Sequence, residues 1–274
     1  MNQAEYDKAV YALAKQFLLQ QSNYGVTSEL LERYLNPKPR PQSIAGIYQR
    51  ILESAQNANM KANVVGGAIG GVENLGPTLC NFDPKAVLAK YQSWESILDD
   101  LEKTLLRGGT IRRTSRSIWP HYCQAILSSA RFMSQFETAD DFYSWVSFFD
   151  NDSRARPALP MLLANEIKGL GFALASDFLK ELGFVNFAKP DVHLQDIFIG
   201  LNLCPADASD YEVSKAVVRL AKNAKVSPYA ADKIFWLIGS GFYYDDKQLG
   251  DKGKIGSKKA EFIKEAKAKL KSFE

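Results

Sequence analysis

The chain has 274 residues, of which 46% are hydrophobic, 12% aromatic and 24% charged, and its formal net charge is +3. This length and composition are typical of a globular protein with two domains of ordinary size. They exclude a disordered, a collagen-like and a membrane-spanning chain.

Secretion and a metal cluster find little support. The first twenty residues carry charged side chains where a signal peptide would be apolar, namely Glu5, Asp7, Lys8 and Lys15. We therefore expect an intracellular protein, in the cytoplasm or nucleoid, or in the nucleus of a eukaryote. The three cysteines stand too far apart for a four-cysteine iron–sulfur or zinc site, so we expect neither cofactor: Cys80, Cys123 and Cys204.

Charge is unevenly distributed along the chain. Residues 245–274 contain nine lysines and six acidic residues, whereas the remainder is neutral overall. Residues 103–136 contain no acidic residue but six basic ones: Lys103, Arg107, Arg112, Arg113, Arg116 and Arg131. Short basic runs are usually solvated surface, but a run of this length without an acid equally indicates an anionic polymer as partner.

Apolar residues recur with the period of an α-helix. One stripe consists of Trp94, Ile97, Leu98, Leu101 and Leu105. Capping signals agree with helices, because Thr138 and Ser209 each stand three residues before an acid, while Asp83 and Ser227 each precede a proline. Alternating strand patterns with Asn-Gly or Asp-Gly turns are absent. The sequence therefore predicts an all-α fold of about eleven helices.

Two segments interrupt the helices. Residues 36–41 contain three prolines at alternate positions, which impose an extended backbone and predict a linker. Residues 65–77 contain five glycines and fit either a closely packed helix or a loop. They are a poor match to a phosphate-binding P-loop, because no Lys-Ser or Lys-Thr follows the glycines and no strand precedes them.

The most informative segment is residues 159–199. A helix that ends near Ile167 is followed by Gly169-Leu170-Gly171 and by a second helix. Backbone N–H groups at the start of this second helix suit a phosphate oxygen. We expect the hairpin carbonyls of Asn165, Ile167 and Leu170 to hold a monovalent cation, K⁺ or Na⁺, that bridges to the same phosphate. An ordinary αα-hairpin without a ligand is the alternative.

The segment after the hairpin adds specificity. Lys189-Pro190-Asp191-Val192-His193 opens a further helix, and Asp191 stands twenty residues beyond Gly171. Helix, Gly-apolar-Gly hairpin, helix and Pro-Asp-Val-His in this order resemble the helix-hairpin-helix (HhH-GPD) superfamily of base-excision DNA glycosylases. The resemblance covers about residues 44–244 and is close only from 165 to 193. It is nearest to the 8-oxoguanine branch, which lacks an iron–sulfur cluster.

This resemblance implies a two-domain helical fold with the helix-hairpin-helix motif at the domain junction. Residues 44–173 would form a six-helix domain that ends in the hairpin, and residues 1–43 would pack with 174–274 in the other domain. The partner would be double-stranded DNA with a modified base, bound by a monomer. The enzyme would flip this base out of the duplex and hydrolyse its N-glycosidic bond.

The resemblance also assigns roles to single residues. Asp191 would be the catalytic carboxylate, and a simple cap for the helix that begins at Val192 is the alternative. Gln56 or Asn57 would fill the gap that the extruded base leaves. Contacts to the DNA backbone would come from Gly169, Gly171, Ala173, His193, Arg112, Arg113 and Arg116. For His193, an ordinary helix-surface histidine is the alternative.

The chain departs from the superfamily pattern in two places. Bifunctional members carry a lysine two residues after the second hairpin glycine, where its amine attacks the sugar. Here that residue is Ala173, so we expect a monofunctional glycosylase unless Lys168 or Lys189 is a displaced nucleophile. The iron–sulfur motif is also missing, and the Lys-rich segment 258–273 either replaces the DNA contacts of that cluster or forms a solvated helix.

The base pocket is the least determined feature. The candidates are aromatic and polar side chains, namely Trp236, Phe235, Asp232, Trp119 and Tyr122, although aromatic residues at helical spacing are more often part of a core. An oxidised purine such as 8-oxoguanine is favoured over an alkylated purine or a bulkier base. The competing hypotheses are a non-catalytic helix-hairpin-helix protein that grips DNA and a helical scaffold without DNA affinity.

Overall fold

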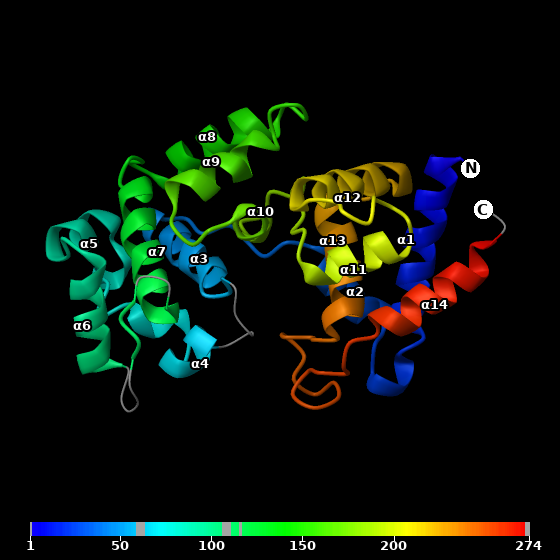
Figure 1. The fold of residues 1–274 in the computed structure, drawn as a ribbon, viewed down its shortest axis with the longest axis horizontal. Coiled ribbons are helices and arrows are strands. Elements are labelled where there is room, and N and C mark those ends of the chain that lie inside the picture. Colours follow the sequence, from blue (N-terminus) through cyan, green and yellow to red (C-terminus); the bar gives the residue numbers. More distant parts are fainter. Residues whose placement is uncertain (1, 59–63, 106–110, 115–116, 272–274) are drawn as a thin grey trace. The chain divides into compact units, whose positions relative to one another are not determined.

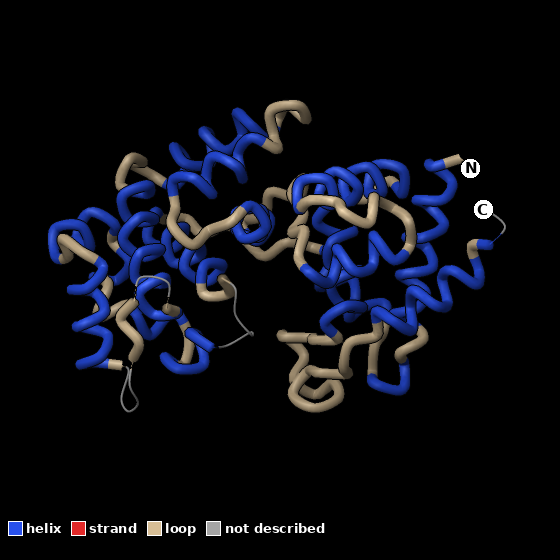
Figure 2. Tube along the Cα trace, viewed as in Figure 1, coloured by secondary structure: helices blue, strands red, loops and turns tan. Residues whose placement is uncertain are grey.

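A computed structural model describes residues 2–58, 64–105, 111–114 and 117–271. Within these ranges the regular elements are helices, and β contacts are limited to the isolated bridges Phe242–Lys254 and Asp251–Lys254 (Figure 2). The prediction of an all-α fold is confirmed. None of the described helices is long and apolar enough to cross a membrane. The chain divides into two compact units: Met1–Lys38 with Gly183–Glu274 (unit 1), and Pro39–Leu182 (unit 2).

Unit 1 is built around α13 (Pro228–Ser240), most of whose residues are buried. Phe235 has no exposed surface, and its ring centroid lies 5.1 Å from that of Phe198 and 6.3 Å from that of Phe262. The other α-helices of the unit all pack against α13 (Figure 1): α1 (Gln3–Leu19), α2 (Ser28–Leu35), α11 (Val192–Gly200), α12 (Asp210–Ala224) and α14 (Lys259–Lys269). A short 3-10 turn, Ser22–Tyr24, links α1 to α2.

Unit 2 is organised around α7 (Ile118–Met133), against which α3, α5, α6 and α9 pack. Its other α-helices are α3 (Ile44–Ala55), α4 (Val64–Ile69), α5 (Pro84–Lys90), α6 (Trp94–Thr104), α8 (Ala139–Asp150), α9 (Ala158–Glu166) and α10 (Phe172–Glu181). Two 3-10 turns, Val72–Leu75 and Cys80–Phe82, lie between α4 and α5. The glycine-rich segment therefore begins as a short helix, α4, and continues as a turn.

The predicted capping signals begin helices as expected. Thr138 accepts a hydrogen bond from the amide of Asp141, and Ser209 forms a complete capping box with Glu212. Asp83 caps α5, whose first residue is a proline. Each such cap satisfies amides that the first turn of a helix leaves without a partner, and it stabilises the helix by about 1 kcal/mol. These helix starts are therefore set by local sequence.

The unit boundaries differ from those that we predicted. The first lies between residues 38 and 39, within the proline linker, rather than after residue 43. The second lies between 182 and 183, whereas we placed it between 173 and 174. The reason is the packing of α10, which contacts α3 and α9 and carries the fully buried Ala175, Phe178 and Leu179. The helix after the hairpin therefore belongs to unit 2.

Candidate functional site

The hairpin between α9 and α10 uses its two glycines for different reasons. Gly169 has a φ of +79°, a backbone conformation that L side chains rarely adopt. A Cβ atom at this position would also lie 2.8 Å from Nε2 of His121. Gly171 has an ordinary φ of −70°, is exposed, and has open space where a Cβ atom would stand. The first glycine is therefore needed for the turn, and the second leaves the start of α10 accessible.

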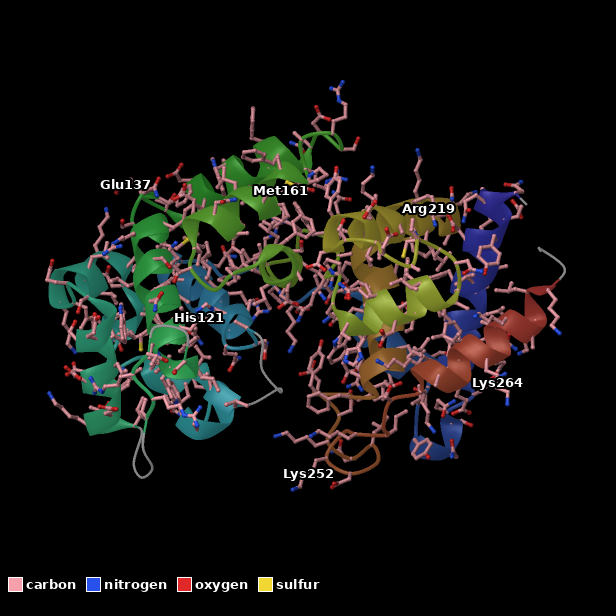
Figure 3. The ribbon with its side chains drawn as sticks, viewed as in Figure 1. His121, Glu137, Met161, Arg219, Lys252 and Lys264 are labelled. Atoms are coloured by element: carbon pink, nitrogen blue, oxygen red, sulfur yellow. The ribbon has the colours of Figure 1, made fainter. Side chains whose placement is uncertain are left out.

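Two residues of α7 hold the hairpin, and sequence reasoning missed both. His121 packs against Gly169, and the hydroxyl of Ser128 accepts a hydrogen bond of 2.9 Å from the amide of Lys168. Figure 3 shows His121 on α7. These residues stand seven positions apart and so lie on the same face of the helix. That spacing was a usable signal, but nothing in the sequence identified the hairpin as the partner of this face.

The start of α10 is the predicted phosphate site. Gly171 carries no side chain that could cap the helix, and Ala173 lies in the first turn, half-buried. Helix N-termini carry a positive partial charge and present N–H groups to anions. The carbonyl of Ile167 accepts a hydrogen bond from Leu170, which closes the turn. A cation on the carbonyls of Asn165, Ile167 and Leu170 stays a prediction.

Asp191 lies in unit 1 and is the N-cap of α11. Its Oδ1 atom accepts hydrogen bonds from the amides of His193 (2.9 Å) and Leu194 (3.3 Å). Within the described part of the chain, Oδ2 takes part in no hydrogen bond. The side chain is only partly buried. Capping is therefore established, and it leaves one carboxylate oxygen for other chemistry.

The backbone on both sides of Asp191 is held by α13. The amide of Lys189 donates a 2.5 Å hydrogen bond to Oδ2 of Asp232, a side chain with no exposed surface. Two residues after Asp191, the imidazole of His193 lies so close to Gly239 that a Cβ atom there would collide with it. Asp232 and Gly239 stand two turns apart on α13, so this helix supports the segment that carries Asp191.

The imidazole of His193 is only partly accessible to a phosphate group. Among the described residues its Nδ1 atom is buried and has no hydrogen-bond partner. Burial lowers the pKa of His193 below its usual 6.5, although the carboxylate of Asp191 acts in the opposite direction. A contact to the DNA backbone would therefore have to use the other ring nitrogen, on a neutral imidazole.

The candidate wedge residues lie at the C-terminal end of α3. Gln56 and Asn57 are both half-buried, and each side-chain amide donates to the carbonyl of Glu53, at 3.0 and 3.4 Å. The Oε1 atom of Gln56 lies close to Gly66 of α4. Residues 59–63 lie outside the described part of the chain. The wedge role of Gln56 or Asn57 stays a prediction.

A buried ion cluster, also missed in the sequence, links α3 to the hairpin helix α10. Asp177 and Lys180 of α10 are 7% and 3% exposed, and Oδ1 of Asp177 lies 3.7 Å from Nζ of Lys180. The hydroxyl of Ser54 donates to Asp177 at 2.9 Å, and Arg50 lies 3.7 Å from the same carboxylate. Removing one member of such a cluster would leave a buried charge without its counterion. The cluster therefore fixes α3 against α10.

The acid-free stretch is less cationic in space than in sequence. Arg113 forms ion pairs with Asp99 (2.8 Å) and Glu102 of α6, and these hydrogen bonds raise its pKa. Arg112 is exposed and has no ion pair within the described residues. Arg107 and Arg116 lie outside the described residues. Arg112 is thus the better candidate for a phosphate contact than Arg113.

The structure corrects the expected base pocket at three positions. Phe235 lies at the centre of the core of unit 1, and Asp232 is the buried acceptor for Lys189. Tyr122 is 1% exposed in unit 2, where its hydroxyl donates to the carbonyl of Leu52. None of the three offers a free face or edge to a base. Trp119 and Trp236 are only partly buried, so their assignment stays a prediction.

The two hairpin glycines should respond differently to the same substitution. Gly169→Ala should destabilise the protein by about 1–3 kcal/mol, because an L residue is strained at this φ and meets His121. Gly171→Ala, the matched control, should change stability by less than about 1 kcal/mol, since its φ is ordinary and the space is open. Urea unfolding checks both, and equal losses for the two variants would contradict the geometry.

The half-buried His193 should make stability depend on pH. Because its pKa is lower in the folded than in the unfolded chain, the unfolded state binds the proton first as the pH falls below 6.5. This contribution to stability should therefore be present well above pH 6.5 and decrease as the pH falls below 6.5. His193→Asn should flatten this part of the urea-unfolding profile. His121→Asn, which changes the other of the two histidines, serves as control and should retain the pH dependence.

Comparisons with known proteins identify the fold. No family model and no curated protein matches the sequence. A crystal structure of the Methanocaldococcus jannaschii 8-oxoguanine glycosylase/lyase, in complex with a 15mer DNA containing 8-oxoguanine, is similar with a TM-score of 0.54 and 16% identity, over 84% of this chain and 98% of that one. A second structure of an 8-oxoguanine DNA glycosylase from this organism gives 0.51 and 15%, over 83% and 92%. The chain therefore has the fold of the helical 8-oxoguanine DNA glycosylases.

Proposed function

We propose that this protein is a DNA glycosylase that flips a modified base out of duplex DNA and hydrolyses its N-glycosidic bond. The observation that carries the proposal is the carboxylate of Asp191, which caps α11 with one oxygen and keeps the other outside the cap. It stands in the Pro-Asp-Val-His segment of a chain that shares its fold with DNA glycosylases. Two features therefore support the proposal together: the fold of the chain and the position of the Asp191 carboxylate.

The chemistry requires little beyond a carboxylate and water. Breaking the bond between C1′ and the base leaves the electron pair on the base and positive charge on the sugar. Oδ2 of Asp191 would stabilise this charge electrostatically. Water then adds to C1′, and one of its protons passes through Asp191 to the departing base. The products are the free base and an abasic sugar.

The hairpin would hold the DNA while the base is extruded. Flipping a nucleotide costs a few kcal/mol of stacking and pairing, which backbone contacts have to supply. The N–H groups at the start of α10 would bind a phosphate beside the open space at Gly171, with Arg112 as a further contact. The carbonyls of Asn165, Ile167 and Leu170 would hold K⁺ or Na⁺ against the same phosphate, and Gln56 or Asn57 would fill the vacated stack.

An oxidised purine such as 8-oxoguanine is the proposed substrate. One protein of the same fold was crystallised with DNA that contains this base, which supports it over an alkylated purine. Double-stranded DNA is the proposed partner, and we propose a monomer that acts inside the cell. No iron–sulfur cluster enters the proposal, because the sequence has only three cysteines and they stand far apart: Cys80, Cys123 and Cys204.

A non-catalytic DNA-binding protein is the second candidate. One observation favours it, since the hydrogen bonds of Asp191 are those of an ordinary helix cap. In that case the hairpin would bind phosphates while Asp191 served only to begin α11. Substituting Asp191 by asparagine distinguishes the two candidates, because a glycosylase would lose base excision whereas a DNA-binding protein would change little.

Asp191→Asn should abolish excision and preserve the fold. Asparagine caps helices about as well as aspartate, so stability should change by less than about 1 kcal/mol. Loss of the carboxylate should lower single-turnover excision by about 100-fold or more, with duplex affinity unchanged. Excision is measured by alkali cleavage on a panel of duplexes that each carry one modified base.

A matched control uses another aspartate cap. Asp83 caps α5 with the same pattern of bonds, to the amides of Lys85 and Ala86. Asp83→Asn should leave excision unchanged. If neither the wild-type protein nor any variant excises a base while duplex binding persists, the non-catalytic candidate replaces the glycosylase.

The absence of an amine at Ala173 should leave the protein without lyase chemistry. In bifunctional action a lysine amine displaces the base from C1′, the sugar ring opens to a Schiff base, and borohydride reduces this to a stable adduct. Wild-type protein should give no adduct with a lesion-containing duplex, whereas Ala173→Lys should give one. An adduct from the wild type would overturn the monofunctional assignment. Loss of that adduct in Lys168→Ala or Lys189→Ala would then identify the nucleophile.

A further inference from the structure

Aromatic rings and lysine ammonium groups alternate at the C-terminal end of α13 in unit 1. The Tyr244 cluster consists of Lys38, Lys233, Trp236, Phe242, Tyr244 and Lys254. The ring of Tyr244 lies at its centre, with its centroid 5.9 Å from that of Trp236 and 6.2 Å from that of Phe242. The proposed chemistry at Asp191 uses none of these side chains except the candidate Trp236.

Each of the three lysines lies over a ring of the cluster. The ammonium of Lys38 is 5.5 Å from the centroid of Tyr244, and that of Lys254 is 5.4 Å from the centroid of Phe242. Lys233 lies 5.2 Å from the centroid of Tyr244 and donates a 2.9 Å hydrogen bond to its hydroxyl. Since Lys233 is only 3% exposed, this contact holds Tyr244 from the protein side.

The cluster lies at the surface of unit 1 and not in its core. Trp236, Phe242 and Tyr244 are each partly exposed, and Lys38 and Lys254 are exposed. By contrast, Tyr34 behind them is 3% exposed, with its ring centroid 5.1 Å from that of Tyr244. Two acids are nearby. Asp245 forms with Lys38 a single exposed ion pair (3.1 Å), which is weak enough for a phosphate to replace, and Asp246 is bound by Arg33 and Tyr34.

Glycines fix the loop that carries Tyr244. Gly241 has a φ of +59°, and a Cβ atom there would collide with the carbonyl of Gly256. Gly253 has a φ of +82°, and its carbonyl accepts a 2.7 Å hydrogen bond from the amide of Tyr243. The loop between α13 and α14 (Figure 1) therefore returns on itself with close backbone contacts. Tyr244 is thus presented on a preorganised backbone, which reduces the entropy lost on binding.

The chemistry of the cluster selects the kind of ligand. A cationic ligand is disfavoured, because the three lysine ammonium groups beside the rings would repel it. A ligand with a flat π face and negative charge suits partly exposed rings beside lysines, and an unpaired nucleotide has both properties. The exposed ammonium groups of Lys38 and Lys254 would attract its phosphates, and an aromatic ring would stack on its base.

We propose that the Tyr244 cluster stacks one unpaired base of a DNA strand, with Lys38 and Lys254 at the flanking phosphates and Lys233 holding Tyr244 in position. This inference rests on the DNA-binding part of the proposed function and is independent of bond cleavage. It adds a base-binding surface to unit 1, built from the end of α13 and the loop between α13 and α14.

The test compares two decamers with equal charge, oligothymidylate and a decamer with abasic sugars at every position. Wild-type protein should bind oligothymidylate about 5- to 150-fold more tightly, the range expected for one stacked base. Tyr244→Leu should remove this preference, whereas Tyr244→Phe should keep most of it. Tyr211→Leu is the control, because Tyr211 forms a similar pair with Lys215 (5.4 Å) on α12, outside the cluster. Equal affinity of the wild type for both decamers would overturn the proposal.

The two lysines give a second readout that does not depend on a half-buried residue. Log affinity for a single strand falls as log salt concentration rises. Each lost phosphate contact should reduce the magnitude of this slope by about 0.7. Lys38→Ala and Lys254→Ala should each show this decrease, and Lys215→Ala should not. An unchanged slope in both variants would contradict the assignment of these lysines.

A duplex with one bulged thymidine, compared with the fully paired duplex, identifies the source of the base. If Tyr244 favours the bulged duplex over the fully paired duplex but does not favour oligothymidylate over the abasic decamer, the cluster binds a flipped nucleotide. If only oligothymidylate is favoured, the cluster binds a displaced single strand. Affinities are measured on thymidine, without excision, and are repeated with Asp191→Asn. Failure of catalysis therefore leaves the result unaffected, and failure of stacking leaves the glycosylase proposal standing.

Discussion

The proposed chemistry depends on two hydrogen bonds from the first turn of α11 to Oδ1 of Asp191. A cap of this kind contributes only about 1 kcal/mol to stability. Its larger effect is geometric, because it holds the carboxylate through one oxygen and leaves the second oxygen outside the cap. Electrostatic stabilisation of a developing charge requires a group that is already in place before the reaction.

The support for this carboxylate comes from α13. The amide of Lys189 is bound to the buried Asp232, and His193 is packed on Gly239, so the chain is held on either side of Asp191. In unit 2 two helices have the corresponding role: His121 and Ser128 of α7 hold the hairpin, and the Asp177–Lys180 cluster of α10 fixes α3. Each unit therefore positions its candidate site residues through well-packed helices.

Local features were predictable from the sequence, and features that depend on distant partners were not. The helices and their caps follow from periodicity and capping residues. Helical spacing could not tell which aromatic residues face a core, so Phe235 and Tyr122 were expected in a pocket. The charge of residues 103–136 was overestimated because Arg113 pairs with acids of α6, which precede that stretch.

The central claim is that the carboxylate of Asp191 acts on the deoxyribose of an extruded nucleotide. The most direct measurement is a crystal structure of the protein with a duplex that contains 2′-fluoro-8-oxoguanosine, whose N-glycosidic bond resists cleavage. We expect Oδ2 of Asp191 at about 3–4 Å from C1′ of the flipped nucleotide, with a phosphate of the same strand at the amides just after Gly171. A complex in which the hairpin binds the phosphate while Asp191 faces away from every sugar would contradict the account.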